Sequence, residues 1–481
     1  MHLNTEGRVE YGDFQTSQAL CREVCDSLIR MNVAPKSIVE PTCGEGSFLK
    51  AALEAFPSCK TVLGFEINKE YVRRARAIEN ATVECVDFFE KNWSETLFTL
   101  QEPILVLGNP PWVTNSTVGA LNGGNLPLKS NHLGSGGVDA ITGKSNFDIS
   151  EWMLLHLLER LSGRTAAVAM LYKTSVARKV LQNAWNRRFH ISQSEMYRID
   201  SAKEFGAAVD ACLLVCILKE RSTSKKCSVY TDLKNPKFES EIALRDGRLI
   251  ANLRAFEDSI HLLGPSNVKW RSGIKHDCSR VMELRVSDCG KLLNGLGEKL
   301  SLEPTYLFPM LKSSELMKPE IEPKKFMLVP QCAPGEETSH IQRDAPKTWA
   351  YLVAHGDLLD RRSSSIYRKR PRFSVFGVGP YSFSSWKVAV SGFYKSLNFR
   401  AVGPIKGKPV VLDDTCYFLP CDSSEDAQRL IELLSSNSAK TFFSSYIFWD
   451  AKRPITAELL NSLDISMLAT ELRTKLPPSF C

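Results

Sequence analysis

The sequence lacks any apolar run long enough to cross a membrane. Its longest uninterrupted apolar run covers residues 211–218, whereas a membrane-spanning helix needs about 20 consecutive apolar residues. The first residues also lack the basic segment followed by an apolar one that marks a secretory signal. We therefore expect a cytoplasmic protein without a membrane partner.

Metal-ligand spacing is also missing. The chain has 14 cysteines and 8 histidines, but no Cys-x-x-Cys pair, and no other histidine is spaced as a ligand partner for His276-Asp277. In a cytoplasmic protein, scattered cysteines are reduced thiols that mostly pack in the core. The sequence therefore predicts no metal site.

Acidic residues are absent from one long stretch, although the net charge of the 481-residue chain is only +7. Residues 361–408 contain basic residues interleaved with aromatic ones and no Asp or Glu, whereas residues 1–150 have an acidic excess. A basic, aromatic-rich stretch is typical of a surface that binds a polyanion such as nucleic acid. The alternative is a solvated basic face over a β-rich core.

Apolar runs and amphipathic segments alternate in the first half of the chain. Short buried strands are predicted at 37–40, 61–65, 104–107 and 165–171, with a late strand at 211–219. Helical spacing separates them at 48–56, 69–79 and 150–161. This alternation indicates an α/β domain on a mostly parallel sheet.

The pattern changes after about residue 265. Proline and glycine become frequent, and regular helices are expected to be scarce until those at 424–435 and 456–471. We predict a boundary near Gly264-Pro265, with a first domain over 1–265 and a mixed, strand-rich second domain over 266–481. Residues 114–145, rich in Gly, Asn and Ser, are predicted to form a long loop in the first domain.

Three predicted strands end in residues suited to a nucleoside. The first leads into Glu40-Pro41-Thr42-Cys43-Gly44-Glu45-Gly46, whose glycines permit close backbone approach before a helix N-terminus. The second ends at Glu66, where a carboxylate can hold both ribose hydroxyls. After the third come Asp87 and Phe88, which could bond and flank an adenine. Together they predict a nucleoside cofactor site.

The fourth strand ends in Asn109-Pro110-Pro111-Trp112. The prolines fix an extended turn, so the Asn109 side chain and the Pro110 carbonyl are held at the strand end. Both oxygens can accept hydrogen bonds from one amino group, and Trp112 offers a face for stacking. Two acceptors would localise the lone pair of an aromatic amino group toward a methyl donor.

These motifs resemble the S-adenosylmethionine-dependent N6-adenine DNA methyltransferases of the gamma arrangement, the Taq-type enzymes of type II restriction-modification systems. The resemblance implies a Rossmann-like class I methyltransferase domain followed by a C-terminal target-recognition domain. It also implies S-adenosyl-L-methionine as cofactor and double-stranded DNA as partner. Protection of host DNA from a cognate restriction endonuclease is the natural role, and we expect a monomer.

The resemblance also implies residue roles. Phe14 and Thr16 would contact the methionine end of the cofactor, as would the turn formed by Glu40, Pro41, Cys43, Gly44 and Gly46. Glu66 would hold the ribose, and Asp87 with Phe88 the adenine. Asn109 and Pro110 would orient the target amino group. Pro111 comes next in the same motif, and Trp112 would stack on the target base. Phe205 would form the second aromatic wall, and the segment Asn146-Phe147-Asp148 would lie near the target pocket.

Other functions remain open at this point. An Asn-Pro-Pro turn can orient any planar amino or amide nitrogen, so RNA adenine or a protein glutamine are alternative substrates, and a non-catalytic DNA-recognition subunit is a third alternative. Glu322-Pro323-Lys324 has the form of half a nuclease motif. Because the two predicted domains already account for the length, we expect no endonuclease in this chain.

Overall fold

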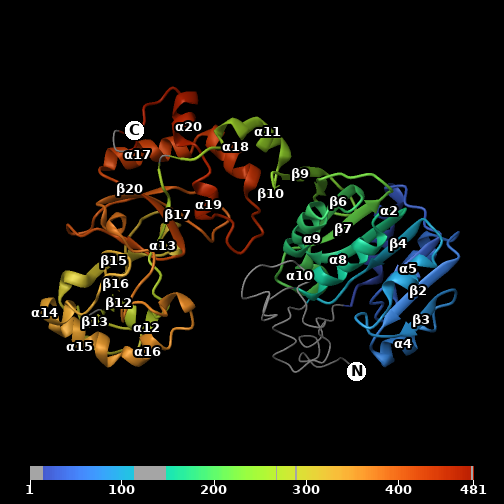
Figure 1. The fold of residues 1–481 in the computed structure, drawn as a ribbon, viewed down its shortest axis with the longest axis horizontal. Coiled ribbons are helices and arrows are strands. Elements are labelled where there is room, and N and C mark those ends of the chain that lie inside the picture. Colours follow the sequence, from blue (N-terminus) through green and yellow to red (C-terminus); the bar gives the residue numbers. More distant parts are fainter. Residues whose placement is uncertain (1–14, 113–147, 267, 288–289, 478–479, 481) are drawn as a thin grey trace. The chain divides into compact units, whose positions relative to one another are not determined.

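The computed structural model describes residues 15–112, 148–266, 268–287, 290–477 and 480. The chain divides into two compact units, Met1–Leu253 and Arg254–Cys481 (Figure 1). The division lies before Gly264-Pro265 because helix α11 (Leu253–Ser259) packs on the second unit, where the ring of Phe256 contacts that of Tyr446 at 5.9 Å. The division of roles between 1–265 and 266–481 stays a prediction.

The first unit contains a ten-stranded sheet in the order β10-β9-β8-β6-β7-β5-β4-β1-β2-β3. Its strands are β1 (Ser37–Glu40), β2 (Thr61–Glu66), β3 (Thr82–Cys85), β4 (Ile104–Gly108), β5 (Ala166–Lys173), β6 (Ile191–Ile199), β7 (Ala211–Leu218), β8 (Lys226–Tyr230), β9 (Phe238–Arg245) and β10 (Arg248–Ile250). The strands from β3 through β5 are parallel, whereas β7 runs antiparallel between β5 and β6. The sheet is therefore mixed.

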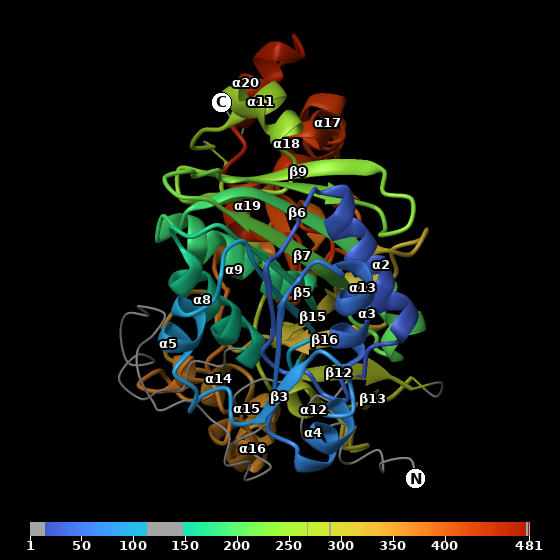
Figure 2. The ribbon, with the colours of Figure 1, turned by 90° about the vertical axis from the view of Figure 1, so that its right-hand side faces the viewer.

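Helices cover both faces of the parallel half of this sheet. They are α2 (Gln18–Arg30), α3 (Ser47–Ala55), α4 (Lys69–Ala75), α5 (Trp93–Phe98), α8 (Ile149–Leu161), α9 (Thr174–Asn186) and α10 (Ser201–Phe205). Figure 2 shows α2 and α3 on one side of the sheet and α5, α8 and α9 on the other. Every residue of β1 and β4 is buried, which explains their continuous apolar sequences.

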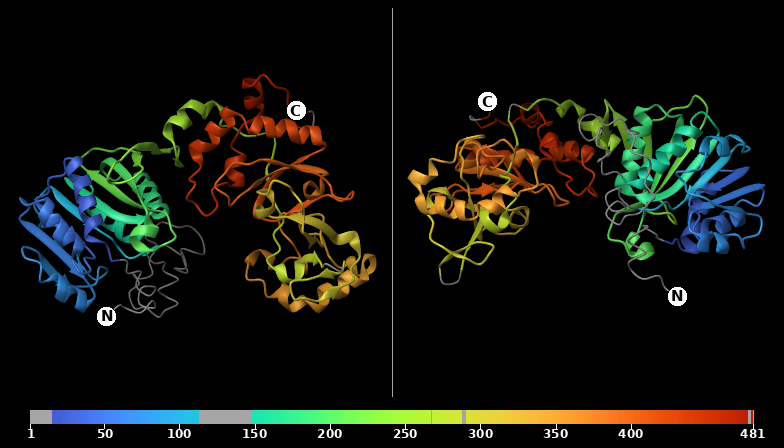
Figure 3. Two further views of the ribbon diagram at one scale, coloured as in Figure 1. Left: turned by 180° about the vertical axis from the view of Figure 1, so that it is seen from behind. Right: turned by 60° about the horizontal axis from the view of Figure 1, so that its bottom comes forward.

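The second unit contains two smaller sheets, as the strand-rich pattern predicted (Figure 3). One has the order β11-β20-β17-β18 and the other β14-β13-β12-β16-β15-β19. Their strands are β11 (Arg271–Ser272), β12 (Glu283–Val286), β13 (Leu292–Leu293), β14 (Lys299–Leu300), β15 (Leu307–Leu311), β16 (Lys325–Leu328), β17 (Trp386–Ser391), β18 (Arg400–Val402), β19 (Val411–Leu412) and β20 (Cys416–Cys421).

Helices of the second unit are short, and one prediction for them is wrong. They are α12 (Ser279–Met282), α13 (Ser313–Leu316), α14 (Ile341–Asp344), α15 (Pro346–Ala354), α16 (Gly356–Asp360), α17 (Ser424–Leu434), α18 (Asn437–Tyr446), α19 (Ala457–Leu460) and α20 (Ile465–Glu471). The single helix expected over 456–471 is divided into α19 and α20. The reason is Asp464, which caps α20 by accepting hydrogen bonds from the backbone N–H groups of Ser466 and Met467.

The basic, aromatic-rich stretch 361–408 is used in part to build the fold. Phe373 and Phe399 are 1% and 6% exposed, and the guanidinium of Arg362 stacks 3.7 Å from the centre of the Tyr367 ring. Phe373 and Phe399 belong to the apolar core, so these two aromatic rings are not part of a surface that could bind a polyanion. Basic side chains such as Lys369 remain exposed.

Candidate active site

The carboxyl ends of β1 and β4 lie side by side near the centre of the parallel strands. Val39 of β1 is opposite Val106 of β4, while β2 lies beyond β1 and β5 lies beyond β4. The strand order therefore reverses between β1 and β4, and open α/β sheets bind ligands at such a reversal. Glu40 and Asn109 stand at these two strand ends.

The turn after β1 depends on its glycines. Gly44 and Gly46 have φ values of +51° and +86°, in the left-handed region that favours glycine. A Cβ on Gly46 would lie 2.3 Å from Ile78 Cδ1. Gly46 is the N-cap of α3 and has no capping side chain. The first N–H groups of α3 consequently begin directly beside this turn, where they can attract an anionic group of a ligand.

Two carboxylates stabilise the neighbouring turns. Glu66, at the end of β2, accepts hydrogen bonds from Gly44 N at 2.9 Å and Asn68 N at 2.8 Å. Asp87, after β3, accepts one from Phe89 N at 2.9 Å. A carboxylate oxygen can accept more than one hydrogen bond. Both side chains can therefore hold their turns and still accept bonds from hydroxyl or amino groups.

Glu40 is a buried carboxylate at the end of β1. It is 2% exposed, and among the described residues its Oε2 atom has no hydrogen-bond partner. Burial first, and then the charge of Glu66, raise the pKa of Glu40 well above its ordinary value. An unsatisfied buried acceptor is costly, so this oxygen is suited to a hydrogen-bond donor on a ligand.

The turn after β4 holds Asn109 in a defined orientation. The amide Nδ2 atom of Asn109 donates to Thr16 Oγ1 at 3.2 Å. Because the nitrogen is directed at Thr16, the carbonyl oxygen of the same amide is directed away from it. Pro110 and Pro111 follow, and the indole Nε1 of Trp112 donates to Leu171 O on β5 at 3.3 Å. The turn is therefore tied to both the N-terminal segment and the sheet.

Trp112 and Phe205 meet, but they leave no space for a base. Their ring centres are 5.0 Å apart and the rings are inclined at 71°, an edge-to-face contact. A base stacked between two rings needs about 7 Å between their faces, since each aromatic contact takes about 3.5 Å. Phe205 ends α10 and precedes Gly206, which has a φ of +64°. A sandwich would therefore require Phe205 to move.

Phe88 does not offer the open ring face predicted for adenine. It is 5% exposed, and its ring packs 4.8 Å from that of Trp93 and 6.1 Å from that of Trp152. Trp93 Nε1 also donates to the backbone oxygen of Phe88 at 2.8 Å. The ring of Phe88 therefore anchors the turn that carries Asp87.

Comparison with known proteins gives a full-length relative. The chain is 45% identical over 478 residues to the type II methyltransferase M.NspV of Nostoc sp. (strain ATCC 29411 / PCC 7524), and the alignment covers 98% of this chain and 99% of the relative. The chain belongs to the type II methyltransferases. It is therefore an enzyme of the restriction-modification class, as the motifs predicted.

The fold of this methyltransferase agrees with a solved structure. The type IIL restriction-modification enzyme MmeI, solved in complex with DNA, matches with a TM-score of 0.56 over 96% of this chain and 68% of that chain, at 13% identity. At this identity the likeness shows the fold alone. No family model matches the sequence. The predicted class I methyltransferase fold with additional strand-rich sheets is confirmed.

S-adenosyl-L-methionine is the cofactor of this methyltransferase. The residues at the strand ends where the order reverses between β1 and β4 fit this cofactor. Backbone N–H groups at the start of α3 suit its carboxylate, Glu66 suits the ribose hydroxyls, and Asp87 suits an adenine amino group. The buried Glu40 Oε2 provides a further acceptor beside the turn. Phe14 lies outside the described residues, as do Asn146 and Phe147.

Lys173 is the residue of this region that the sequence reasoning missed. Its Nζ donates to Trp112 O at 3.0 Å and to Asp148 Oδ2 at 2.8 Å. Asp148, 7% exposed, also accepts from Ser150 N and Ser150 Oγ as the N-cap of α8. A usable signal existed, because Lys173 is a polar residue that ends the apolar strand β5, as Glu40 and Glu66 end theirs.

In the part of the chain that the structure describes, no group of three or more His, Cys, Asp or Glu side chains could hold a metal ion. In the same part, none of the helices has the length and apolar composition needed to cross a membrane.

Proposed function

We propose that this type II methyltransferase is a site-specific DNA adenine-N6 methyltransferase, which acts on an adenine flipped out of duplex DNA. The observation that carries the proposal is the Asn109 side chain, held by Thr16 at the carboxyl end of β4. It stands at the strand reversal beside the predicted cofactor turn. The residues that keep their assigned roles in the cofactor site are Phe14, Thr16, Glu40, Pro41, Cys43, Gly44, Gly46, Glu66, Asp87 and Asn109. Phe88 supports the site by anchoring the turn that carries Asp87.

Asn109 and Pro110 would prepare the target nitrogen. Asn109 Oδ1 and Pro110 O would each accept a hydrogen bond from one N–H group of the amino nitrogen. These two bonds would draw the hydrogens out of the ring plane and localise the lone pair on that nitrogen. When bound, S-adenosylmethionine supplies a methyl group activated on a positively charged sulfur. The remaining work is positioning, together with hydrogen bonds that strengthen as charge develops on the nitrogen.

Trp112 and Phe205 would hold the flipped base. Trp112 is fixed by its bond to Leu171 O, whereas Phe205 closes the space and moves aside when the base enters. Base flipping costs a few kcal/mol of unstacking, which stacking between aromatic side chains offsets. The mobile partner is Phe205 because its helix ends at the left-handed Gly206.

Residues 266–481 would recognise the DNA sequence, and residues 1–265 would carry the chemistry. The exposed basic side chains of the stretch 361–408 supply phosphate contacts, which fix the protein on duplex DNA without reading bases. We assign the enzyme to the cytoplasm as a monomer that protects host DNA from a cognate restriction endonuclease.

The test is methyl transfer from tritiated S-adenosylmethionine to duplex DNA, followed by nucleoside analysis. Label in N6-methyladenine, absent with Asn109→Ala and retained with the exposed control Asn235→Ala, is the expected result. Label found on RNA or on a protein glutamine, and absent from DNA, would show that RNA or protein is the substrate and would overturn the DNA assignment. If the wild-type protein bound DNA without transferring label to any of the three substrates, a non-catalytic recognition subunit would take the place of this proposal.

A further inference from the structure

The second unit contains a cavity of about 620 Å³ beside strand β12 of its six-stranded sheet. The cavity is lined by α12, by β12, by the turn 294–297, and by one lysine from each of two neighbouring segments. Four lining side chains are cations, and the lining contains a single carboxylate. The cations are Arg280, Arg285, Lys312 and Lys325, and the carboxylate is Glu283. We call this cavity the Glu283 pocket.

Glu283 orders two of these cations. Its side chain is 4% exposed, and its two oxygens accept hydrogen bonds from Lys312 Nζ at 2.5 Å and from Lys325 Nζ at 2.8 Å. His276 Nε2 lies 3.4 Å from Oε1. Burial would raise the pKa of Glu283, but hydrogen bonds from His276, Lys312 and Lys325 hold it well below its usual range. The carboxylate is therefore a fixed anchor for both lysines.

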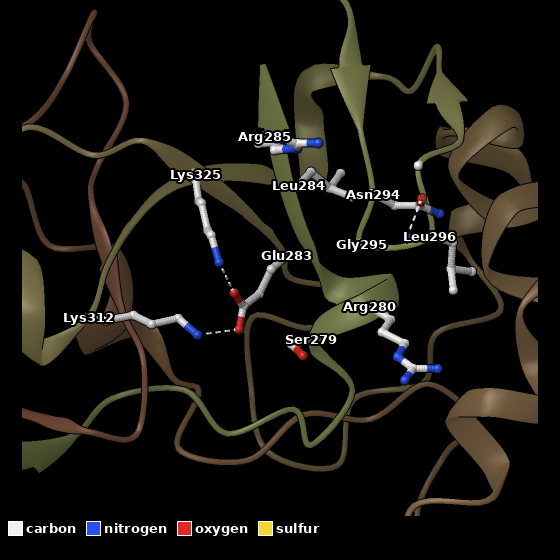
Figure 4. Close-up of a pocket in the computed structure, with 11 residues that line it drawn as sticks. Ser279, Arg280, Glu283, Leu284, Arg285, Asn294, Gly295, Leu296, Lys312 and Lys325 are labelled. Atoms are coloured by element: carbon white, nitrogen blue, oxygen red, sulfur yellow. Dashed lines mark hydrogen bonds and ion pairs between the residues drawn. The ribbon is translucent and has the colours of Figure 1, made fainter. Parts of the chain in front are cut away.

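The cations exceed what Glu283 neutralises. Each lysine ammonium group has three donors, and the bonds to Glu283 use one donor of each. Figure 4 shows both lysines reaching Glu283 from one side, while Arg280 extends from α12 on the other. The lining itself has a net charge of three positive units. Asp413, whose Oδ2 lies 3.8 Å from Lys312 Nζ, offsets one of them, so an excess of two positive charges remains to attract anions.

The wall opposite the lysines is the turn 294–297, which carries the side chains of Asn294 and Leu296 and contains two glycines. Asn294 Oδ1 accepts hydrogen bonds from Leu296 N and Glu298 N, both at 3.0 Å. A Cβ on Gly295 would lie 2.7 Å from Arg280 Cα, so this turn packs directly on α12. These contacts fix the backbone of the turn against α12, and an ordered wall lowers the entropic cost of binding.

We propose that the Glu283 pocket binds one phosphate group of the nucleic-acid backbone. A phosphate offers several charged oxygens, so it can bridge two lysines that already share one carboxylate, and the two arginines can add further bonds. The exposed side chains of Arg280 and Arg285 keep the site open to a long polymer. The inference rests on the proposed DNA methyltransferase function and adds a phosphate contact outside the catalytic site.

The test is the salt dependence of binding to a mixed-sequence 25-base-pair duplex. Loss of one phosphate contact should reduce the slope of log K against log salt by about 0.9. We expect this reduction for Lys325→Gln and for Arg285→Gln, and an unchanged slope for the charge-matched control Lys440→Gln on α18. Arg285 is exposed, so its replacement keeps the test valid if Lys325→Gln fails to fold.

The outcomes separate the two proposals. A wild-type protein that does not bind duplex DNA would overturn both. Wild-type binding and methylation, with unchanged slopes in both pocket variants, would overturn the phosphate assignment alone. Inorganic phosphate at constant ionic strength is the second probe. If it raises the Tm of the wild type but not of Lys325→Gln, while the DNA slopes do not change, the pocket binds a free phosphate and the backbone assignment is wrong.

Discussion

Replacing Lys173 by Met should lower both the free energy of unfolding and the rate of methyl transfer, and the two effects have different causes. Lys173 is 24% exposed in its side chain and Asp148 only 7%, so the variant leaves a buried carboxylate without its cation. Removal of one partner of a buried pair costs about 3–5 kcal/mol. Because Asp148 keeps two hydrogen bonds from Ser150, we expect a loss of about 3 kcal/mol in the free energy of unfolding.

The same variant removes the donor to Trp112 O, which should impair methyl transfer. One hydrogen bond contributes about 0.5–1.5 kcal/mol, so poor positioning of the turn should lower kcat about tenfold at the upper end of that range. The KM for S-adenosylmethionine should change little, because Lys173 contacts the target-side turn. Urea denaturation and steady-state methylation assays measure the two effects.

A double variant distinguishes positioning from charge neutralisation. In Lys173→Met with Asp148→Asn, no buried charge remains, so most of the lost stability should return. Trp112 O still lacks its donor, so kcat should stay low. Lys173→Arg, which keeps a donor and the charge, should retain more activity than Lys173→Met. A double variant with the kcat of the wild type would refute the positioning role and reduce Lys173 to a counter-ion.

Three further predictions concern the cofactor turn after β1 and the proposed base pocket beside it. Gly46→Ala should destabilise the protein by about 1–3 kcal/mol, because its φ of +86° and the nearby Ile78 exclude a Cβ, and should weaken cofactor binding measured by calorimetry. Phe205→Ala should lower kcat/KM for DNA at least fivefold, since one stacking contact of about 1–3 kcal/mol is lost, with little effect on cofactor affinity; an unchanged kcat/KM would exclude Phe205 from the pocket. The pKa of Glu40 is raised by burial, so the native state keeps its proton at pH values where the unfolded state has lost it, and stability should fall as the pH rises above about 4.5. In Glu40→Gln, the free energy of unfolding measured by urea titration should fall less as the pH rises. If the variant and the wild type had identical profiles of stability against pH, the raised pKa of Glu40 would be contradicted.

The strand ends of the first unit could be predicted from sequence because burial there is simple. The strand predicted at 37–40 agrees with β1, and those at 61–65 and 104–107 end within one residue of β2 and β4. Continuous apolar runs are characteristic of parallel strands that are covered on both faces. A polar residue that ends such a run lies at the carboxyl edge of the sheet, so the positions of Glu40 and Glu66 at that edge followed from the pattern.

Contacts between distant residues could not be predicted in the same way. The edge-to-face contact of Trp112 with Phe205 and the packing of Phe88 against Trp93 depend on side-chain directions that spacing does not determine. The helix predicted over 456–471 is divided not only by the cap at Asp464 but also by the bond from Asp464 N to Leu262 O, which holds the residues between α19 and α20 against η1 (Ile260–Leu262). That partner is far away in sequence, so a local helical pattern contains no information about it.

Charge in the second unit shows why composition is a weak guide to a binding surface. The acid-free stretch 361–408 supplies Phe373 to the core and pairs Arg362 with Tyr367 inside the unit. The pocket with an excess of cations is instead assembled from α12, β12 and two lysines, around the acidic Glu283. A buried carboxylate lowers the net charge of the sequence, yet it fixes lysines that would otherwise be dispersed in solvent. Anion sites of this type are therefore found from the partners of a buried acid, and the count of basic residues along the chain does not reveal them.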